Sequence, residues 1–212
     1  MIRFLAISFG IFFLFSSCSL RTTEGLRQVP HVDSEITNPY FANSNLDYVY
    51  KAKIEVYTRN FGGILIIKKT DANTHRIVMT AEFGGKLMDL EYDGHTFTKN
   101  FVIDELDRKF ILEVLKEDFR MLLIEKTKPI ATYISPEAQV FKASNGNRFD
   151  FYFFGSTSGF LDKIVKTSKS KEKVTVNFSS LDGQVAEKIA IHHNNIQLKI
   201  DLEKFKEEKN AN

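Results

Sequence analysis

The chain has 212 residues, and 29 Lys and Arg against 27 Asp and Glu give it a formal net charge of +2. This near balance gives no electrostatic case for nucleic acid as a partner. A single Cys excludes a disulfide within the chain, and the length fits one domain with its own core.

Residues 1–20, MIRFLAISFGIFFLFSSCSL, have the layout of a secretory signal. One arginine precedes an apolar run from Phe4 to Phe15, and small serines follow it. The run is short for a bilayer span, so a retained transmembrane anchor is the less favoured alternative. The pattern predicts a signal peptide over residues 1–17.

The stretch LFSSC, which ends at Cys18, resembles the bacterial lipobox in a relaxed form. The resemblance implies cleavage before Cys18 and lipidation of its thiol, which gives the one cysteine a role; an idle thiol is the alternative. Ser19 follows, without an acidic run. By resemblance to sorting rules of known lipoproteins, this implies the periplasmic face of a bacterial outer membrane.

Residues 18–45 are polar, contain Pro30 and Pro39, and show no sustained hydrophobic period. This composition predicts a lipidated tether. Residues 46–205 are then the folded domain, and residues 206–212 are a charged tail.

Alternating apolar and polar residues predict strands in the first half of the domain. In Tyr48–Val56, for example, Tyr50 and Ile54 share one face and Lys51 and Lys53 the other. Further strands are predicted at Phe61–Lys68, His75–Glu82, Lys86–Tyr92 and Thr96–Lys99. Short strands with tight turns are typical of an antiparallel meander.

The period then changes to that of a helix, from Asp104 to Leu123, with one broad apolar stripe. We expect Asp104 to cap its N-terminus. After a loop predicted for residues 125–136, strands resume at Phe149–Phe153, Phe160–Lys166, Lys173–Phe178, Val185–His192 and Ile196–Leu202. The pattern predicts an α+β fold: a single curved antiparallel sheet (an incomplete β-barrel) with the mid-chain helix covering its concave side.

Phenylalanine is abundant: fifteen of the twenty lie after the signal, and there is no Trp. These side chains either fill a core or line a dry cavity that is receptive to acyl chains.

Three successive stretches carry a family resemblance. FGGILIIKK, RIVMTAEFGGKLMDLEYDGHTFTKN and DELDRKFILEVLKEDFRMLL resemble the LolB lipoprotein receptors of the LolA/LolB-like fold. The resemblance spans roughly residues 50–123 and, more weakly, 185–202. The tryptophans usual in that family are absent, and residues 127–173 have no counterpart.

The resemblance implies an outer-membrane lipoprotein that accepts triacylated lipoproteins from a LolA-like periplasmic carrier and inserts them into the outer membrane. It implies membrane lipid as a further partner and a membrane-insertion loop at Phe83, Gly84 and Gly85. The acyl chains would occupy a cavity between sheet and helix. Its expected lining is Ile54, Ile64, Ile66, Leu106, Phe110, Phe149, Phe151 and Phe153. We expect a monomer and no cofactor.

Phe83 has a competing interpretation, in which it folds back to cap the core while the two glycines supply the turn. A turn tip normally faces water, so an aromatic residue there requires either a core or a membrane beside it.

Catalytic patterns are weak. The five histidines read as solvated residues beside turns or in the tether: His31, His75, His95, His192 and His193. Gly155-Ser-Thr-Ser-Gly159 lacks the spacing of a hydrolase elbow. Asp104, Asp107 and Asp118 read as capping or solvated residues. We expect no enzyme and no metal site. The alternatives that remain are a structural or assembly lipoprotein that binds a protein partner and, more distantly, a lipid-active enzyme.

Overall fold

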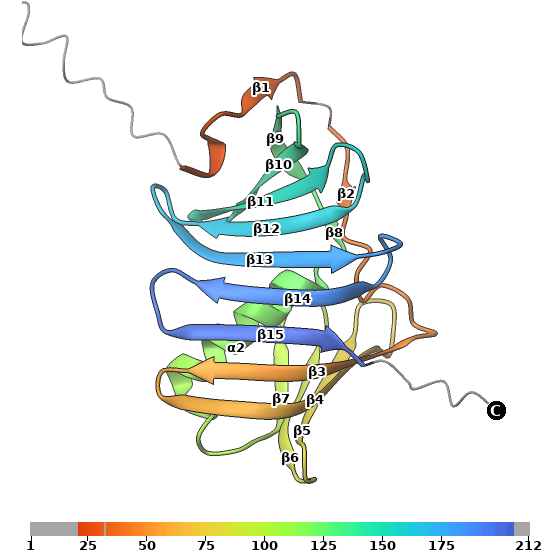
Figure 1. Ribbon diagram of the computed structural model, residues 1–212, viewed down its shortest axis with the longest axis vertical. Helices are drawn as coiled ribbons and strands as arrows, with labels where there is room; N and C mark the ends of the chain where they lie inside the picture. Colours follow the sequence, from red (N-terminus) through yellow and green to blue (C-terminus); the bar gives the residue numbers. More distant parts are fainter. Residues whose placement is uncertain (1–20, 32, 206–212) are drawn as a thin grey trace, which may run out of the picture.

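The computed structural model describes residues 21–31 and 33–205, which form a large antiparallel sheet with a helix against one face (Figure 1). The predicted signal peptide, Cys18 and the charged tail therefore lie outside the described residues. The first elements are a 3-10 turn, η2 (Arg21–Thr23), and the strands β1 (Arg27–Val29), β2 (Ile36–Thr37), β3 (Asp47–Val56), β4 (Arg59–Lys69), β5 (His75–Ala81), β6 (Lys86–Tyr92) and β7 (Phe97–Val102).

The helix and the remaining strands follow. They are α2 (Lys109–Leu123), β8 (Lys126–Thr127), β9 (Pro129–Ile134), β10 (Ala138–Asn145), β11 (Arg148–Gly155), β12 (Leu161–Thr167), β13 (Glu172–Ser180), β14 (Ala186–His193) and β15 (Leu198–Lys204). The order in the sheet is β1-β9-β10-β11-β12-β13-β14-β15-β3-β4-β5-β6-β7, and β2 pairs separately with β8. The end strands of the described sheet, β1 and β7, do not pair with each other, so the sheet stays open. The predicted fold class is confirmed.

The alternation expected for β3 is present in the structure. Tyr50, Ala52 and Ile54 are buried, whereas Lys51 and Lys53 are exposed. β3 also joins the two halves of the sheet, because β15 pairs with it in register from Leu198 opposite Val56. We call the face that carries the buried residues of β3 the inner face.

α2 packs on the inner face, behind β14, β15 and β3 in Figure 1. Leu115, Phe119 and Leu122 are fully buried in the same apolar cluster as the inward residues of the sheet. Burying each such side chain contributes roughly 1.5–3 kcal/mol, which an isolated helix of this length would lack.

The helix begins later than predicted. Residues 104–106 form a turn, and the residue that precedes the helix is Arg108, without a side-chain capping bond. Leu106 is nevertheless buried in the core. The turn lets Leu106 pack inward before the helix starts, so the apolar stripe extends beyond the N-terminus of the helix.

Two regions that were expected to lack regular structure contain strands instead. The predicted loop at residues 125–136 contains β8 and β9, and β10 follows it. The predicted tether is also structured from Arg21 onward, since β1 pairs with β9 and β2 with β8. The tether prediction is wrong for its described part.

Candidate functional site

The β5–β6 hairpin presents Phe83 at its tip. The turn is closed by hydrogen bonds from Gly84 N to Ala81 O at 3.1 Å and from Ala81 N to Gly85 O at 2.9 Å. Gly84 and Gly85 have φ of +86° and +88°, which only glycine adopts at little cost. Phe83 is 101% exposed, so the interpretation in which it caps the core is wrong.

The base of this hairpin is held by a charge network on Asp89, whose side chain is buried. Arg76 donates to both carboxylate oxygens at 3.1 and 2.9 Å, Lys86 Nζ donates at 2.8 Å and Asn100 Nδ2 at 3.3 Å. These donors hold the pKa of Asp89 well below its ordinary value. The network ties β5, β6 and β7 together below the turn, which keeps the tip pointing away from the core.

The residues expected to line an acyl cavity do not share one face. Ile54 and Leu106 belong to the inner core. Ile64 and Ile66 lie on the opposite face of β4 from the buried Leu65 and Ile67, and Ile66 is 37% exposed. The expectation is wrong for these two, because four consecutive apolar residues in β4 give no alternation from which to choose a face.

Phe149, Phe151 and Phe153 also lie on the outer face, where they form a second apolar cluster with Val140 and Val165. Lys142 Nζ lies 3.8 Å from the ring centre of Phe149, and Lys163 Nζ lies 4.0 Å from that of Phe153. Leu26 from the N-terminal segment packs on this cluster. The three phenylalanines therefore do not line the space under α2, and their assignment to a cavity is wrong.

The inner face beside the end of α2 is filled by two aromatic residues that the sequence placed in the tether. Tyr40 stacks on Phe178 with ring centres 4.8 Å apart, and its hydroxyl donates to Leu161 O at 3.0 Å. Phe41 contacts Tyr48 and Tyr50, with ring centres 5.0 and 5.9 Å apart. Both side chains are 1% exposed. Sequence reasoning missed them because no period marks their segment.

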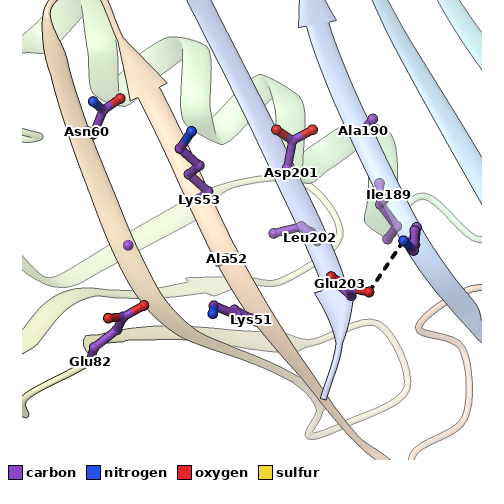
Figure 2. A pocket seen from close by; sticks show the side chains of 12 residues that line it. Lys51, Ala52, Lys53, Asn60, Glu82, Ile189, Ala190, Asp201, Leu202 and Glu203 are labelled. Atoms are coloured by element: carbon purple, nitrogen blue, oxygen red, sulfur yellow. Dashed lines mark ion pairs between the residues drawn. The ribbon is translucent and has the colours of Figure 1, made fainter. Parts of the chain in front are cut away.

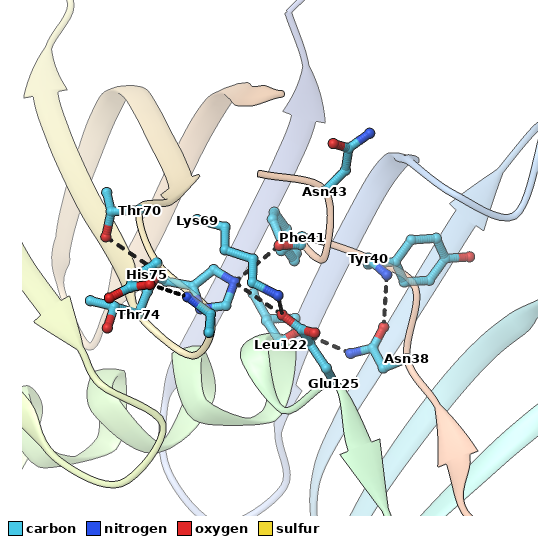
Figure 3. Close-up of polar contacts among 12 residues, drawn as sticks. Asn38, Tyr40, Phe41, Asn43, Lys69, Thr70, Thr74, His75, Leu122 and Glu125 are labelled. Carbon is cyan, nitrogen blue, oxygen red and sulfur yellow. Dashed lines mark hydrogen bonds and ion pairs between the residues drawn. The ribbon is translucent and has the colours of Figure 1, made fainter. Parts of the chain in front are cut away.

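Polar contacts fix this pair in place (Figure 3). Asn38 Nδ2 donates to Leu122 O at 2.9 Å, and Asn38 N donates to Glu125 O at 2.8 Å. The Leu122 carbonyl is one of the last four of α2, which a helix leaves unpaired. His75 Nε2 lies 3.0 Å from Phe41 O, and Lys69 Nζ donates to Glu125 Oε1 at 2.5 Å.

A groove of about 440 Å³ opens at the other end of the helix, between the first half of α2 and the ends of β12, β13 and β14. Phe110, Val114, Val174 and Ile196 supply apolar walls, and Phe110 is 55% exposed there. Of the expected lining residues, Phe110 borders this groove. The volume lies within the usual range of roughly 300–1,000 Å³ for ligand pockets.

Two polar pairs lie along the same groove, one buried (His193 with Asp118) and one between the buried Lys166 and the partly exposed Glu117. His193 Nε2 is 2.9 Å from Asp118 Oδ2, and Lys166 Nζ donates to Glu117 Oε2 at 3.1 Å. Burial raises the pKa of Asp118 above its ordinary value. The expectation that His193 and Asp118 are solvated is therefore wrong, as it is for His75. Adjacent His192 and His193 point to opposite faces of β14, so one of them had to face inward.

The outer face has its own hollow, of about 550 Å³, across β14, β15, β3 and β4 (Figure 2). Charged side chains of both signs surround it, including Lys188 and Glu203, whose charged atoms are 3.3 Å apart. Small residues contribute to its lining, among them Gly62 and Ala190. At the adjacent Gly63, a Cβ would lie 1.8 Å from Thr80 O, so close strand packing requires glycine there.

Within residues 21–31 and 33–205, no group of three or more His, Cys, Asp or Glu side chains could hold a metal ion. In the same residues, no helix has both the length and the hydropathy that crossing a membrane requires.

Comparison with known proteins finds a likeness in backbone to solved structures, but no likeness in sequence. No family model matches the chain, and no curated protein matches it. A crystal structure of a LolA superfamily protein from Nitrosomonas europaea is similar in backbone, with a TM-score of 0.49 and 6% sequence identity. The match covers 80% of this chain and 90% of the other.

Proposed function

We propose that this protein is an outer-membrane lipoprotein, anchored through Cys18, that accepts triacylated lipoproteins from a periplasmic carrier and inserts them into the outer membrane. The observation that carries the proposal is the complete exposure of Phe83 at the tip of a braced hairpin. An aromatic residue that contacts nothing of its own chain is suited to contact lipid.

The energetics set the role of Phe83. Transferring one phenylalanine side chain from water to lipid contributes roughly 1.5–3 kcal/mol. That free energy orients a protein that is already tethered, but it is too small to anchor one.

The acyl chains of the cargo would bind in the apolar region under α2. Phe110 and Val114 of the helix face Val174 and Ile196 across the groove at its N-terminal half. The inner face beyond is built from aliphatic and aromatic side chains. Entry at this groove places an acyl chain between helix and sheet, where burial of its methylenes contributes roughly 0.8 kcal/mol each.

Vesicle flotation tests the loop. The probe is the chain from residue 18 with Cys18→Ser, mixed with vesicles of phosphatidylethanolamine and phosphatidylglycerol. Phe83→Glu should lower the membrane-bound to free ratio by about tenfold to a hundredfold, as the lost transfer free energy requires. Leu181→Glu is the matched control, because Leu181 is 84% exposed in the β13–β14 turn, away from the hairpin. Equal losses in both variants would refute the loop's role.

One observation favours the alternative, an assembly lipoprotein that binds a protein partner on the same scaffold. Tyr40 and Phe41 already occupy the inner face beside the end of α2. Mass spectrometry of the protein purified in mild detergent separates the two functions. Co-purified acylated peptide or lipid supports the carrier function, whereas a bound protein and no acyl compound supports the assembly function.

A further inference from the structure

The N-terminal segment, defined here as residues 21–31 and 33–46, docks on the domain through few regular contacts. β1 pairs with β9 over three residues, and β2 pairs with β8 over two. The side chains make the stronger contacts: Tyr40 and Phe41 on the inner face and Leu26 on the outer cluster. Its attachment therefore combines buried apolar side chains, which another apolar group could replace, with the hydrogen bonds of Asn38, Tyr40 and Phe41.

The docked conformation carries backbone strain. Phe41 has a φ of +65°, in the left-handed region that non-glycine residues rarely adopt. Such a conformation persists only where its surroundings hold it. Here the buried ring and the contact of Phe41 O with His75 hold it.

The docked segment also sets where the anchor lies. η2 and β1 are at one end of the long axis of the molecule, and the β5–β6 turn is at the other (Figure 1). Two residues lie between Cys18 and Arg21, so three Cα–Cα steps place the anchor within about 11 Å of the start of η2 even when fully extended. With the segment docked, the anchored end faces the membrane and the Phe83 tip faces away from it.

We infer that the N-terminal segment is a releasable plug, which an incoming acyl chain displaces from the inner face. The inference rests on the proposed function and adds its regulation. The acyl chain replaces Tyr40 and Phe41 against Phe178, Tyr48 and Tyr50, and the strain at Phe41 is relieved. Once β1 also separates from β9 and Leu26 leaves the outer cluster, the freed residues become tether, so the hairpin tip can turn toward the bilayer only after cargo has bound.

The coupling follows from differential binding. A ligand shifts a conformational equilibrium only by as much as it prefers one state. An acyl chain in the position of Tyr40 and Phe41 is incompatible with the docked segment, so it binds only the released state. Without cargo the plug keeps apolar surface covered and holds Phe83 away from the anchored end.

Hydrogen exchange measured by mass spectrometry tests the plug. The sample is the chain from residue 18 with Cys18→Ser, and the probe is a synthetic triacylated lipopeptide, with the same peptide without acyl chains as control. Lipopeptide should raise the exchange rate of amides in residues 36–46 at least tenfold. The amides of Lys109–Leu123 should stay protected, because α2 remains on the sheet.

Two further variants make the test more specific. Each replaces by glycine an aromatic residue whose backbone is in the left-handed conformation. Phe41→Gly removes the buried ring and should raise the affinity for lipopeptide about tenfold. Tyr57→Gly is the matched control, because Tyr57 has a φ of +52° but is 56% exposed, and it should leave the affinity unchanged.

The outcomes separate the plug from the function it rests on. Lipopeptide that binds while residues 36–46 keep their protection overturns the plug and leaves the carrier function standing. Lipopeptide that binds neither the unmodified sequence nor Phe41→Gly overturns both.

Discussion

Two short connections of this protein carry aromatic residues, and they place them in opposite environments. Phe83 lies between two seven-residue strands whose register fixes the turn, so its ring extends into solvent. Tyr40 and Phe41 lie between a two-residue strand and a ten-residue strand, and both rings are buried on the inner face. The paired strands of the hairpin prevent Phe83 from folding back onto the core. The irregular segment that contains Tyr40 and Phe41 can bend, so its aromatic side chains become buried.

The difference shows that apolar residues in loops need a structural context before they indicate a function. At Phe83 the sheet enforces exposure, and the Asp89 network stabilises the strands below it. At Phe41 the segment accepts a strained backbone in order to bury the ring. The exposed ring of Phe83 is therefore suited to contact a membrane. The strained backbone of the buried Phe41 favours release of its segment from the inner face.

Truncating the two phenylalanines should give the largest contrast. Phe41→Ala should lower the free energy of unfolding by about 3 kcal/mol, because it empties a buried position and leaves alanine in the left-handed conformation. Phe83→Ala should change it by less than about 0.5 kcal/mol, since an exposed side chain makes no packing contact. Urea denaturation followed by circular dichroism measures both. A difference below about 1 kcal/mol would contradict the contrast.

Loosening the base of the hairpin should have a smaller effect. Asp89→Asn removes a buried carboxylate that accepts hydrogen bonds from two cations, so we expect a loss of about 1–3 kcal/mol. Asp201→Asn is the control, because Asp201 pairs with Lys199 at 2.7 Å on the surface, where an ion pair contributes about 0–1 kcal/mol. Equal losses in urea denaturation would show that the Asp89 network does not brace the hairpin.

Lowering the pH should weaken the docking of the N-terminal segment, and this is the smallest of the three expected effects on stability. Burial lowers the pKa of His75 below its ordinary 6.5, and the charged groups beside it are Glu125, 3.8 Å away, and Lys69. The neutral ring stabilises the docked segment fully above pH 6.5. As the pH falls below 6.5, the released state gains a proton that the buried ring does not, so stability declines.

The docked segment should lose about 1 kcal/mol of stability, or less, between pH 7 and pH 5.5. Hydrogen exchange in residues 36–46, corrected for the intrinsic pH dependence, should therefore accelerate over that range. His75→Gln should remove the extra acceleration, and His95→Gln, which alters an exposed ring, should keep it. Acceleration that persists in His75→Gln would assign the effect to another group.

Sequence patterns predicted the elements whose two faces differ chemically. The alternation in β3 and the stripe of α2 each mark a buried side, and both were confirmed. β4 is apolar on both faces, because Ile66 follows Leu65. β11 does alternate, but its inner face carries Asp150 and Tyr152, whereas its three phenylalanines that were expected to line the cavity face outward. Periodicity cannot choose the inner face of such strands, and the cavity residues drawn from them were wrong.

The site itself depended on contacts between distant residues. Asn38 donates to the carbonyl of Leu122, 84 residues later and in the last turn of α2, and His193 lies beside Asp118, which is 75 residues away in the sequence. A polar segment with two prolines gives no local signal that it will cover a sheet. Phe83 was the exception, because two neighbouring glycines and two flanking strands define a turn locally.

Transfer of cargo tests the central claim most directly. A triacylated lipoprotein, loaded on its soluble periplasmic carrier, is mixed with the Cys18→Ser chain, and the two proteins are then separated by affinity capture of one of them. The account predicts that the lipoprotein moves to this chain in a stable complex of one to one, and that its unacylated form does not. An acylated cargo that stays on the carrier, under conditions in which the carrier releases it to membranes, would contradict the account.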